Sequence, residues 1–281
     1  MANADLTRIN TNIAALNALN ALREVNAKLA LHQLRLATGR RINSAADDPA
    51  GMTFAKKLDS RARGLAVARD NIGDVQNLLS VAEGGIQNIS EILITMKEKI
   101  LQAANDTLGS SERAAVEAQL DDLAAEIDQI VQSTTWGGVS LLDGTYTNKQ
   151  FQVGEQSTDT LSFSISQDHR ASALGVADSD LDVSTATLAS AALAAVNSAI
   201  NTVNSSLQSI GSASARMQIK EANISVAITN VMASYSRIYN ADMAMEQLEA
   251  TKYLVLQQTA TAMLAQANLA PQTILTLIRG V

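Results

Sequence analysis

Residues 72–100 decide the fold, and they read IGDVQNLLSVAEGGIQNISEILITMKEKI. Apolar side chains recur there in alternating steps of three and four, at Ile72, Val75, Leu79, Ala82, Ile86, Ile89, Leu93, Met96 and Ile100. Such a heptad repeat is typical of a helix whose apolar seam packs against partner helices with a left-handed supercoil. The stretch therefore predicts a long helix within a bundle or coiled coil.

Two other stretches carry the same repeat. The first has apolar residues at Val116, Leu120, Leu123, Ile127 and Ile130. The second has them at Leu193, Val196, Ile200, Val203, Leu207, Ile210, Met217, Ile224, Ile228, Val231, Tyr235 and Ile238, with Ser214 and Glu221 as polar interruptions. A helix over residues 188–240 would be about 80 Å long, at about 1.5 Å per residue. Helices of this length favour an extended bundle over a globule.

The two ends of the chain carry apolar stripes of their own. The first begins at Leu6, Ile9, Ile13 and Leu16 and drifts to Leu19, Leu22 and Leu29. The second runs through Leu256, Ala260, Met263, Ala267, Ala270, Ile274 and Leu277. Charges are sparse over residues 254–277, so this helix would be poorly solvated alone and should be buried on several sides. We expect the two ends to pair antiparallel and to drive assembly.

The middle of the chain changes from helical repeats to strand signals. Trp136-Gly137-Gly138 is a turn signal. Residues 149–153 and 160–165 alternate apolar and polar side chains, which predicts a β-hairpin closed by the loop 154–159. Residues 168–182 are expected to form an irregular, surface-exposed connection. The predicted fold class is mainly α: a long antiparallel coiled-coil or helical-bundle rod with one small β-hairpin and both termini paired at one end.

Composition excludes several classes of function. The 281 residues have a formal charge of −7, whereas nucleic-acid binding needs clustered Lys and Arg. Cys is absent and His occurs twice, which excludes disulfides, thiolate metal sites and a His-based metal cluster within one chain. The start of the chain shows no Sec-type signal peptide, and no unbroken apolar run approaches the roughly 18 residues of a membrane span. By these rules alone the protein would be cytosolic.

The polar pairs that could carry chemistry also have structural explanations. Asp47-Asp48 could act as an acid–base pair, but an Asp before Pro49 is typical of a helix N-cap. Arg40-Arg41 could hold a phosphate, although no Gly-rich loop supports such a site. His32 is predicted on a helix and His169 in a polar loop, both in solvated or interface positions. No Ser has a plausible His–Asp pairing, so the chain is predicted to be no enzyme and to need no cofactor.

Glu83-Gly84-Gly85 lies inside a strong helical pattern. Two glycines there cost about 1 kcal/mol each relative to Ala, so a compensating role is expected. They would permit either close helix packing, which is favoured, or slight bending of the helix. A phosphate-binding interpretation lacks every other element of such a site.

Both ends of the chain resemble a known family. Residues 9–16 read INTNIAAL, residues 36–51 read LATGRRINSAADDPAG, and residues 264–268 read LAQAN. Over residues 1–145 and 185–281 the chain is similar to bacterial flagellins. Its short centre leaves no room for the domains that larger flagellins insert. The chain is therefore identified as a core-only member of that family.

The resemblance implies a division into domains. Residues 1–38 and 243–281 would form the terminal coiled coil known as domain zero. A spoke over residues 39–48 would join it to the helical bundle of domain one, which would comprise residues 49–134 and 185–242. Residues 135–184 would form the β-hairpin and a surface connector.

The implied function is that of a structural subunit that polymerises into the flagellar filament for motility. The chain would be exported unfolded through the flagellar type III apparatus and would be extracellular. Its implied partners are further copies of itself, hook-associated and cap proteins, and an export chaperone at the C-terminal helix. In the spoke, salt bridges to neighbouring subunits would involve Arg40, Arg41, Asp47 and Asp48.

A flagellin-sensing Toll-like receptor is a further implied partner. The matching segment consists of Thr95, Met96, Lys97, Glu98 and Lys99. Recognised flagellins carry Arg where Thr95 stands and Leu where Lys99 stands, so weak stimulation is expected. Two rival functions are a hook–filament junction adaptor, which would form a single ring, and a membrane-active helical protein. The filament-type ending favours the filament subunit over the adaptor, and the lack of a Lys/Arg-rich polar face argues against membrane activity.

Overall fold

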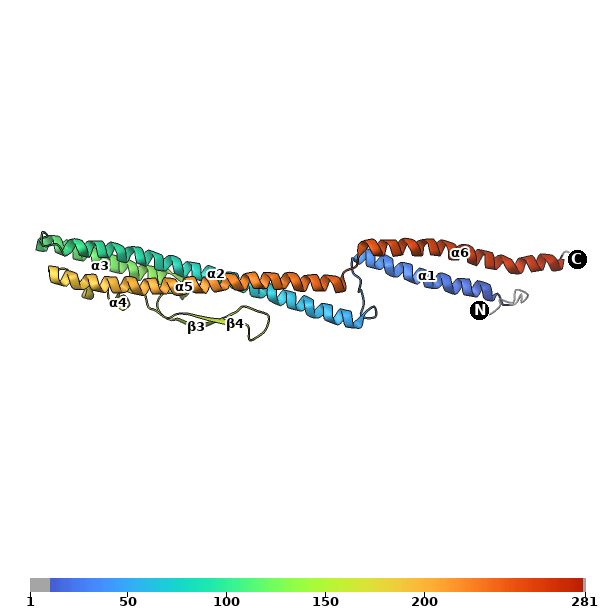
Figure 1. Cartoon of the computed structure of the whole chain (residues 1–281), viewed down its shortest axis with the longest axis horizontal. Helices are drawn as coiled ribbons and strands as arrows, with labels where there is room; N and C mark the ends of the chain where they lie inside the picture. The colour runs from blue at the N-terminus through green and yellow to red at the C-terminus, as the bar shows by residue number, and fades with distance from the viewer. Residues whose placement is uncertain (1–10, 280–281) are drawn as a thin grey trace. The chain divides into compact units, whose positions relative to one another are not determined.

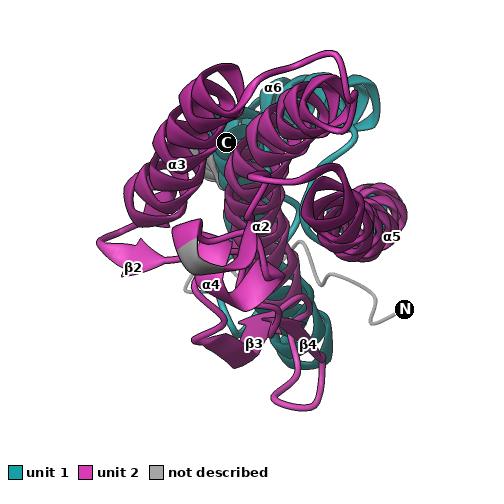
Figure 2. Ribbon diagram, turned by 90° about the vertical axis from the view of Figure 1, so that its left-hand side faces the viewer, with its two compact units in different colours: residues 1–60, 231–281 teal, residues 61–230 magenta. Residues whose placement is uncertain are grey.

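The computed structural model describes residues 11–279, with side-chain surroundings for all of these except Ser179 and residues 270–279. The elements in chain order are α1 (Ile13–Thr38), α2 (Pro49–Ala103), α3 (Ser110–Ser133), β1 (Thr135–Trp136), β2 (Val139–Ser140), β3 (Tyr146–Gln152), β4 (Thr160–Ile165), α4 (Ala171–Leu174), the 3-10 turn η1 (Asp178–Asp180), α5 (Ala186–Tyr239) and α6 (Met243–Arg279) (Figure 1). The predicted mainly α class with a small β-hairpin is confirmed. The chain divides into two compact units, residues 1–60 with 231–281 and residues 61–230 (Figure 2).

Local capping chemistry explains where the helices begin and end. The side chain of Asn12 accepts a hydrogen bond from the Ala15 N–H at 3.0 Å and caps α1, and Gly39 ends that helix in the left-handed region at φ 68°. Asp48 Oδ1 accepts from the Gly51 N–H at 2.8 Å. Pro49 is the first residue of α2, so the predicted N-cap and first helical position are confirmed.

The core of the unit 61–230 lies between α2, α3 and α5, which run side by side (Figures 1 and 2). All nine predicted seam residues of α2 are at most 3 % exposed, which confirms the heptad prediction. In the other two helices the prediction is only partly right. In α3, Ala124 and Val131 are buried in place of Leu123 and Ile130, and in α5 small residues such as Ala192 take the inward position beside Leu193. Ala allows the helices to approach closely, while its larger neighbour flanks the seam.

The glycine pair of α2 has two different surroundings. A Cβ on Gly85 would lie 2.7 Å from Thr134 Oγ1 and 2.9 Å from Leu142 Cδ1, whereas a Cβ on Gly84 would meet nothing within 4 Å. Gly85 therefore serves the predicted close packing, at the point where the chain leaves α3. The structure assigns no such role to Gly84.

The predicted hairpin is present, with β3 beginning three residues before the expected strand. Strands β3 and β4 pair antiparallel, with Phe151 opposite Leu161 and an irregularity between Tyr146 and Lys149. The prediction of an exposed connection after the hairpin is wrong. Its aliphatic side chains pack into the unit instead, and Ala171, Leu174, Val176, Leu181 and Val183 are all buried.

Helix α5 meets the length and composition of a membrane span, with a mean hydropathy of 1.3 over its most apolar window. The sequence has no unbroken apolar run of this length, so this match was not predicted. Ala raises the hydropathy of the helix, and residues such as Val196 and Val203 are buried inside the unit. Core helices of water-exposed proteins share these properties, so the match is weak support for a membrane role.

Candidate assembly surfaces

Two connectors, between α1 and α2 and between α5 and α6, are tied together by backbone hydrogen bonds. The Ala241 N–H donates to the Gly39 carbonyl at 3.0 Å, and the Arg41 N–H donates to the Tyr239 carbonyl at 2.8 Å. Ile42 is buried at 1 % exposure beside them. The two connectors are therefore hydrogen-bonded to each other and form a packed junction.

The four predicted spoke residues make contacts within this chain. The Arg41 guanidinium donates from Nε and Nη2 to the Ile238 carbonyl at 3.0 and 2.8 Å, and it lies 3.6 Å from Asp48 Oδ2. Asp47 Oδ2 accepts from the Ser44 and Asn43 N–H groups, which lower the pKa of that carboxyl. The guanidinium of Arg40 lies 5.3 Å from the ring centroid of Tyr239. Salt bridges from these residues to neighbouring subunits stay a prediction.

Six polar side chains, here called the inner face, make hydrogen bonds or ion pairs between α1 and α6: Asn12, Asn26, His32, Arg35, Glu246 and Gln257. In the same pair Leu29 is buried, and Leu19, Leu22 and Leu264 are half-buried. Asn12 Nδ2 donates to the Ala267 carbonyl at 2.8 Å, and Gln257 Nε2 donates to Asn26 Oδ1 at 2.7 Å. Both His32 and Arg35 contact the carboxylate of Glu246, at 2.5 and 3.3 Å. The partners descend along α6 as they ascend along α1, so the predicted antiparallel pairing is confirmed (Figure 1).

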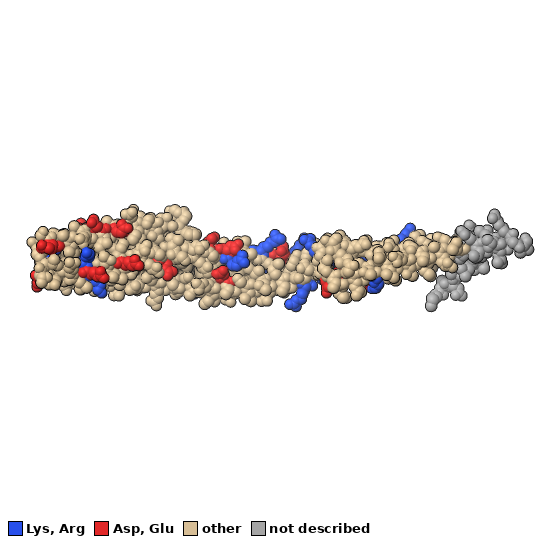
Figure 3. Space-filling view, turned by 90° about the horizontal axis from the view of Figure 1, so that it is seen from above, with Lys and Arg blue, Asp and Glu red and all other residues tan. Residues whose placement is uncertain are grey.

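Eleven large apolar side chains of the same pair are exposed and form what we call the outer face. It comprises Ile13, Leu16, Leu34, Met243, Met245, Leu248, Leu254, Val255, Leu256, Met263 and Leu269, each between 40 and 62 % exposed. Few charges interrupt the surface of α1 and α6 on the face that Figure 3 shows.

The predicted apolar stripes are therefore partly right. Leu29 is buried and Leu19, Leu22 and Ala260 are half-buried as predicted, whereas other predicted members are exposed. Ile13 and Leu16 are exposed, whereas the neighbouring Asn12 and Ala15 are half-buried. Leu256 and Met263 are exposed in the same way, and Ala267 is half-buried. Adjacent helical residues point about 100° apart, so a shift of one residue is enough to exchange an exposed position for a half-buried one. Leu6 and Ile9 lie outside the described residues, as do the side chains of Ile274 and Leu277.

The predicted receptor segment lies on α2 and contains one residue that no partner can reach. Thr95 and Glu98 are exposed, and Lys97 and Lys99 are half-buried. Met96 is 0 % exposed because it belongs to the heptad seam. The prediction of Met96 as a contact residue is therefore wrong, and the other four stay a prediction.

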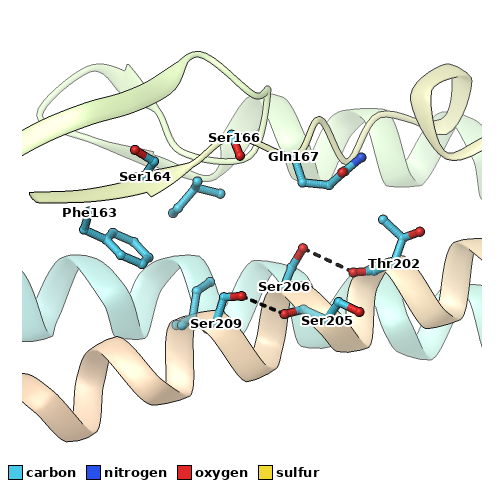
Figure 4. Close-up of a pocket in the computed structure, with 10 residues that line it drawn as sticks. Phe163, Ser164, Ser166, Gln167, Thr202, Ser205, Ser206 and Ser209 are labelled. Atoms are coloured by element: carbon cyan, nitrogen blue, oxygen red, sulfur yellow. Dashed lines mark hydrogen bonds between the residues drawn. The ribbon is translucent and has the colours of Figure 1, made fainter.

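A polar cavity of about 270 Å³ lies between β4 and α5 (Figure 4). Its walls include the hydroxyls of Thr202, Ser205 and Ser209, which donate to the carbonyls of Ser198, Asn201 and Ser205 on their own helix. None of the described residues that line it is charged. These three hydroxyls are therefore already bonded to the backbone of α5.

His169 beside this cavity was predicted in a polar loop, in a solvated or an interface position. The solvated alternative is wrong, because the side chain is 0 % exposed. Its Nε2 lies 3.0 Å from Ser206 Oγ and its Nδ1 lies 3.3 Å from the Leu142 carbonyl. Burial lowers the pKa of the imidazole. The ring thus joins the connection after the hairpin to α5. Among the described residues, no three His, Cys, Asp or Glu side chains come together as metal ligands.

Comparison with known proteins agrees with this architecture. Residues 9–147 match the bacterial flagellin N-terminal helical region, and residues 193–278 match the bacterial flagellin C-terminal helical region. The flagellin of Bacillus subtilis is 36 % identical over 97 % of this chain and 100 % of its own length. Flagellin FlaB1 of Treponema pallidum is 30 % identical over 96 % of this chain and 99 % of its own. The crystal structure of Bacillus cereus flagellin has a TM-score of 0.50 and 25 % identity over 59 % of this chain and 94 % of that one. Since both helical regions match and relatives align almost end to end, this chain belongs to the bacterial flagellin family.

Proposed function

We propose that this chain is a structural subunit that polymerises into the flagellar filament through the outer face of α1 and α6. The observation that carries the proposal is the number of large apolar side chains that this helix pair leaves exposed, while only Leu29 and Ala250 are buried among its described apolar side chains. Fully burying one Leu or Met side chain contributes about 1.5–3 kcal/mol. Apolar surface of this extent marks an interface with other proteins, and further copies of the chain would cover it.

Single charges on the outer face test this proposal. Leu16→Asp and Met263→Asp should each abolish seeded polymerisation, because a buried, unpaired carboxylate is strongly disfavoured. Asn20→Asp is the matched control, since it places the same charge on an exposed polar position of α1. Sedimentation and electron microscopy would follow the assembly. Normal filaments from both apolar variants would contradict the proposal, and isolated rings from the unsubstituted chain would favour the adaptor function.

The outer face also suggests that the chain needs a partner before it is secreted. The exposed apolar side chains of α6 would be an aggregation hazard inside the cell, and an export chaperone would cover them before secretion. The subunit would then act outside the cell as a structural protein and not as a catalyst. Isothermal titration of the flagellin export chaperone with a peptide of residues 253–279 should detect binding at micromolar concentrations. Absence of binding would remove the chaperone from this account.

A chain without its ends should fold but not assemble. Removing residues 1–38 and 243–281 should leave a helical monomer, because the buried seam of α2 lies in the unit 61–230. Circular dichroism would measure its helicity, and sedimentation would measure its assembly. Native filaments from the shortened chain would contradict the role given to the ends.

A further inference from the structure

Few apolar side chains are fully buried in the α1–α6 pair, although Leu19, Leu22 and Leu264 are half-buried. Among the described side chains of these helices, Leu29 and Ala250 are the buried apolar ones. The specific contacts are polar and occur at three levels, at Asn12, at Asn26 and at Glu246. Apolar seams with a heptad spacing tolerate a slide of seven residues, whereas polar contacts do not.

Glu246 is the most constrained of these groups. Its side chain is 12 % exposed, and its carboxylate contacts two side chains of α1, His32 and Arg35. His32 in turn stacks on Tyr253 of α6, with ring centroids 5.2 Å apart. The nearby carboxylate of Glu249 pairs instead with Lys252 of its own helix. Among the described residues of the pair, Glu246 therefore makes the ion pairs that cross between the helices.

We propose that Glu246, with His32 and Arg35, sets the register of α1 against α6. A slide of one heptad moves the helices by about 10 Å and separates Glu246 from both partners. In one direction Lys28 could approach Glu246, but Lys28 is 47 % exposed and already pairs with Glu24 at 2.8 Å. A nearly buried carboxylate without its partners strongly disfavours the shifted state. The proposal deepens the proposed function, because the register places the outer-face residues of both helices relative to each other.

Pulsed electron paramagnetic resonance on the full chain can measure this register. The chain has no Cys, so nitroxide labels can be placed through Asn20→Cys on α1 and Gln247→Cys on α6, two exposed positions. Labelled chain would be polymerised in a large excess of unlabelled chain, so that only distances within one subunit are recorded. The unsubstituted inner face should give one distance.

The test variant is Arg35→Met with Glu246→Leu, which removes both charges and keeps similar volume. We expect a second distance that differs by about 10 Å, with the native register's preference falling from at least a hundredfold to within about tenfold. The urea midpoint should be unchanged or higher, because apolar replacement of a buried charge pair is often neutral or stabilising. Glu246→Gln, the least disruptive variant, should show the second distance at a lower population. Glu249→Leu is the matched control and should keep one distance.

One unchanged distance in both Glu246 variants would overturn the proposal, as would a second distance in the Glu249 control. Sedimentation before labelling separates this result from the proposed function. If the unsubstituted chain does not polymerise, the proposed function fails. The same distances in the free chain would then test the register by themselves.

Discussion

Replacing each glycine of the pair in α2 by Ala should change stability in opposite directions. At Gly84 an added Cβ meets nothing within 4 Å, so Gly84→Ala should stabilise the chain by about 0.5–1 kcal/mol through helix propensity. At Gly85 the same methyl would lie 2.7 Å from Thr134 Oγ1 and 2.9 Å from Leu142 Cδ1. Thr134 is 8 % exposed and its hydroxyl donates to the Ile130 carbonyl at 2.7 Å, so it cannot easily move away.

Overpacking of this kind costs about 1–3 kcal/mol, and the gain in propensity offsets about 1 kcal/mol of it. Gly85→Ala should therefore lose up to about 2 kcal/mol, and the two variants should differ by roughly 1–3 kcal/mol. Urea unfolding followed by circular dichroism and by the fluorescence of Trp136, the single Trp two residues after Thr134, would measure both. Adding Thr134→Ala to Gly85→Ala should recover part of the loss. Equal stability of the two single variants would refute the packing argument.

Three further predictions concern other sites. Burial holds the pKa of His169 below its ordinary value of 6.5. Below that pH the unfolded chain binds a proton at this residue more readily than the folded chain does. The free energy of unfolding should therefore be highest above about pH 6.5 and should fall as the pH drops toward the lowered pKa. Urea midpoints at about pH 7.5 and about pH 5 should show this loss for the unsubstituted chain but not for His169→Asn. Gly51→Ala would place a Cβ 2.2 Å from Asp48 Oδ2 and should displace the N-cap of α2, at a cost of about 1 kcal/mol in stability. Faster amide hydrogen exchange at the start of α2 would show this loss. Gly73→Ala is the control, because a Cβ there meets nothing within 4 Å. Thr95→Arg with Lys99→Leu should raise signalling in Toll-like receptor reporter cells about thirtyfold, as expected for one gained interface anchor; full potency of the unsubstituted chain would contradict this.

Local patterns in the sequence determined much of the fold. The heptad steps over residues 72–100 identified the buried side of α2 at all nine positions. The Asp48-Pro49 pair marked the start of that helix, and alternation marked the hairpin strands. These features depend on residues a few positions apart, because helical periodicity, capping and strand alternation act over one or two turns of the chain.

Only the tertiary structure decided which of two neighbouring positions faces a partner helix. Adjacent residues of a helix point about 100° apart. Asn12 donates a hydrogen bond to the Ala267 carbonyl across the pair, and the neighbouring Ile13 is exposed. The same limit explains why Ala192 and not Leu193 is buried in α5. It also explains the buried His169 and the difference between Gly84 and Gly85, since each depends on what a distant part of the chain brings to that position. Periodicity identifies a stripe, whereas the packing of the partner selects the residues within it.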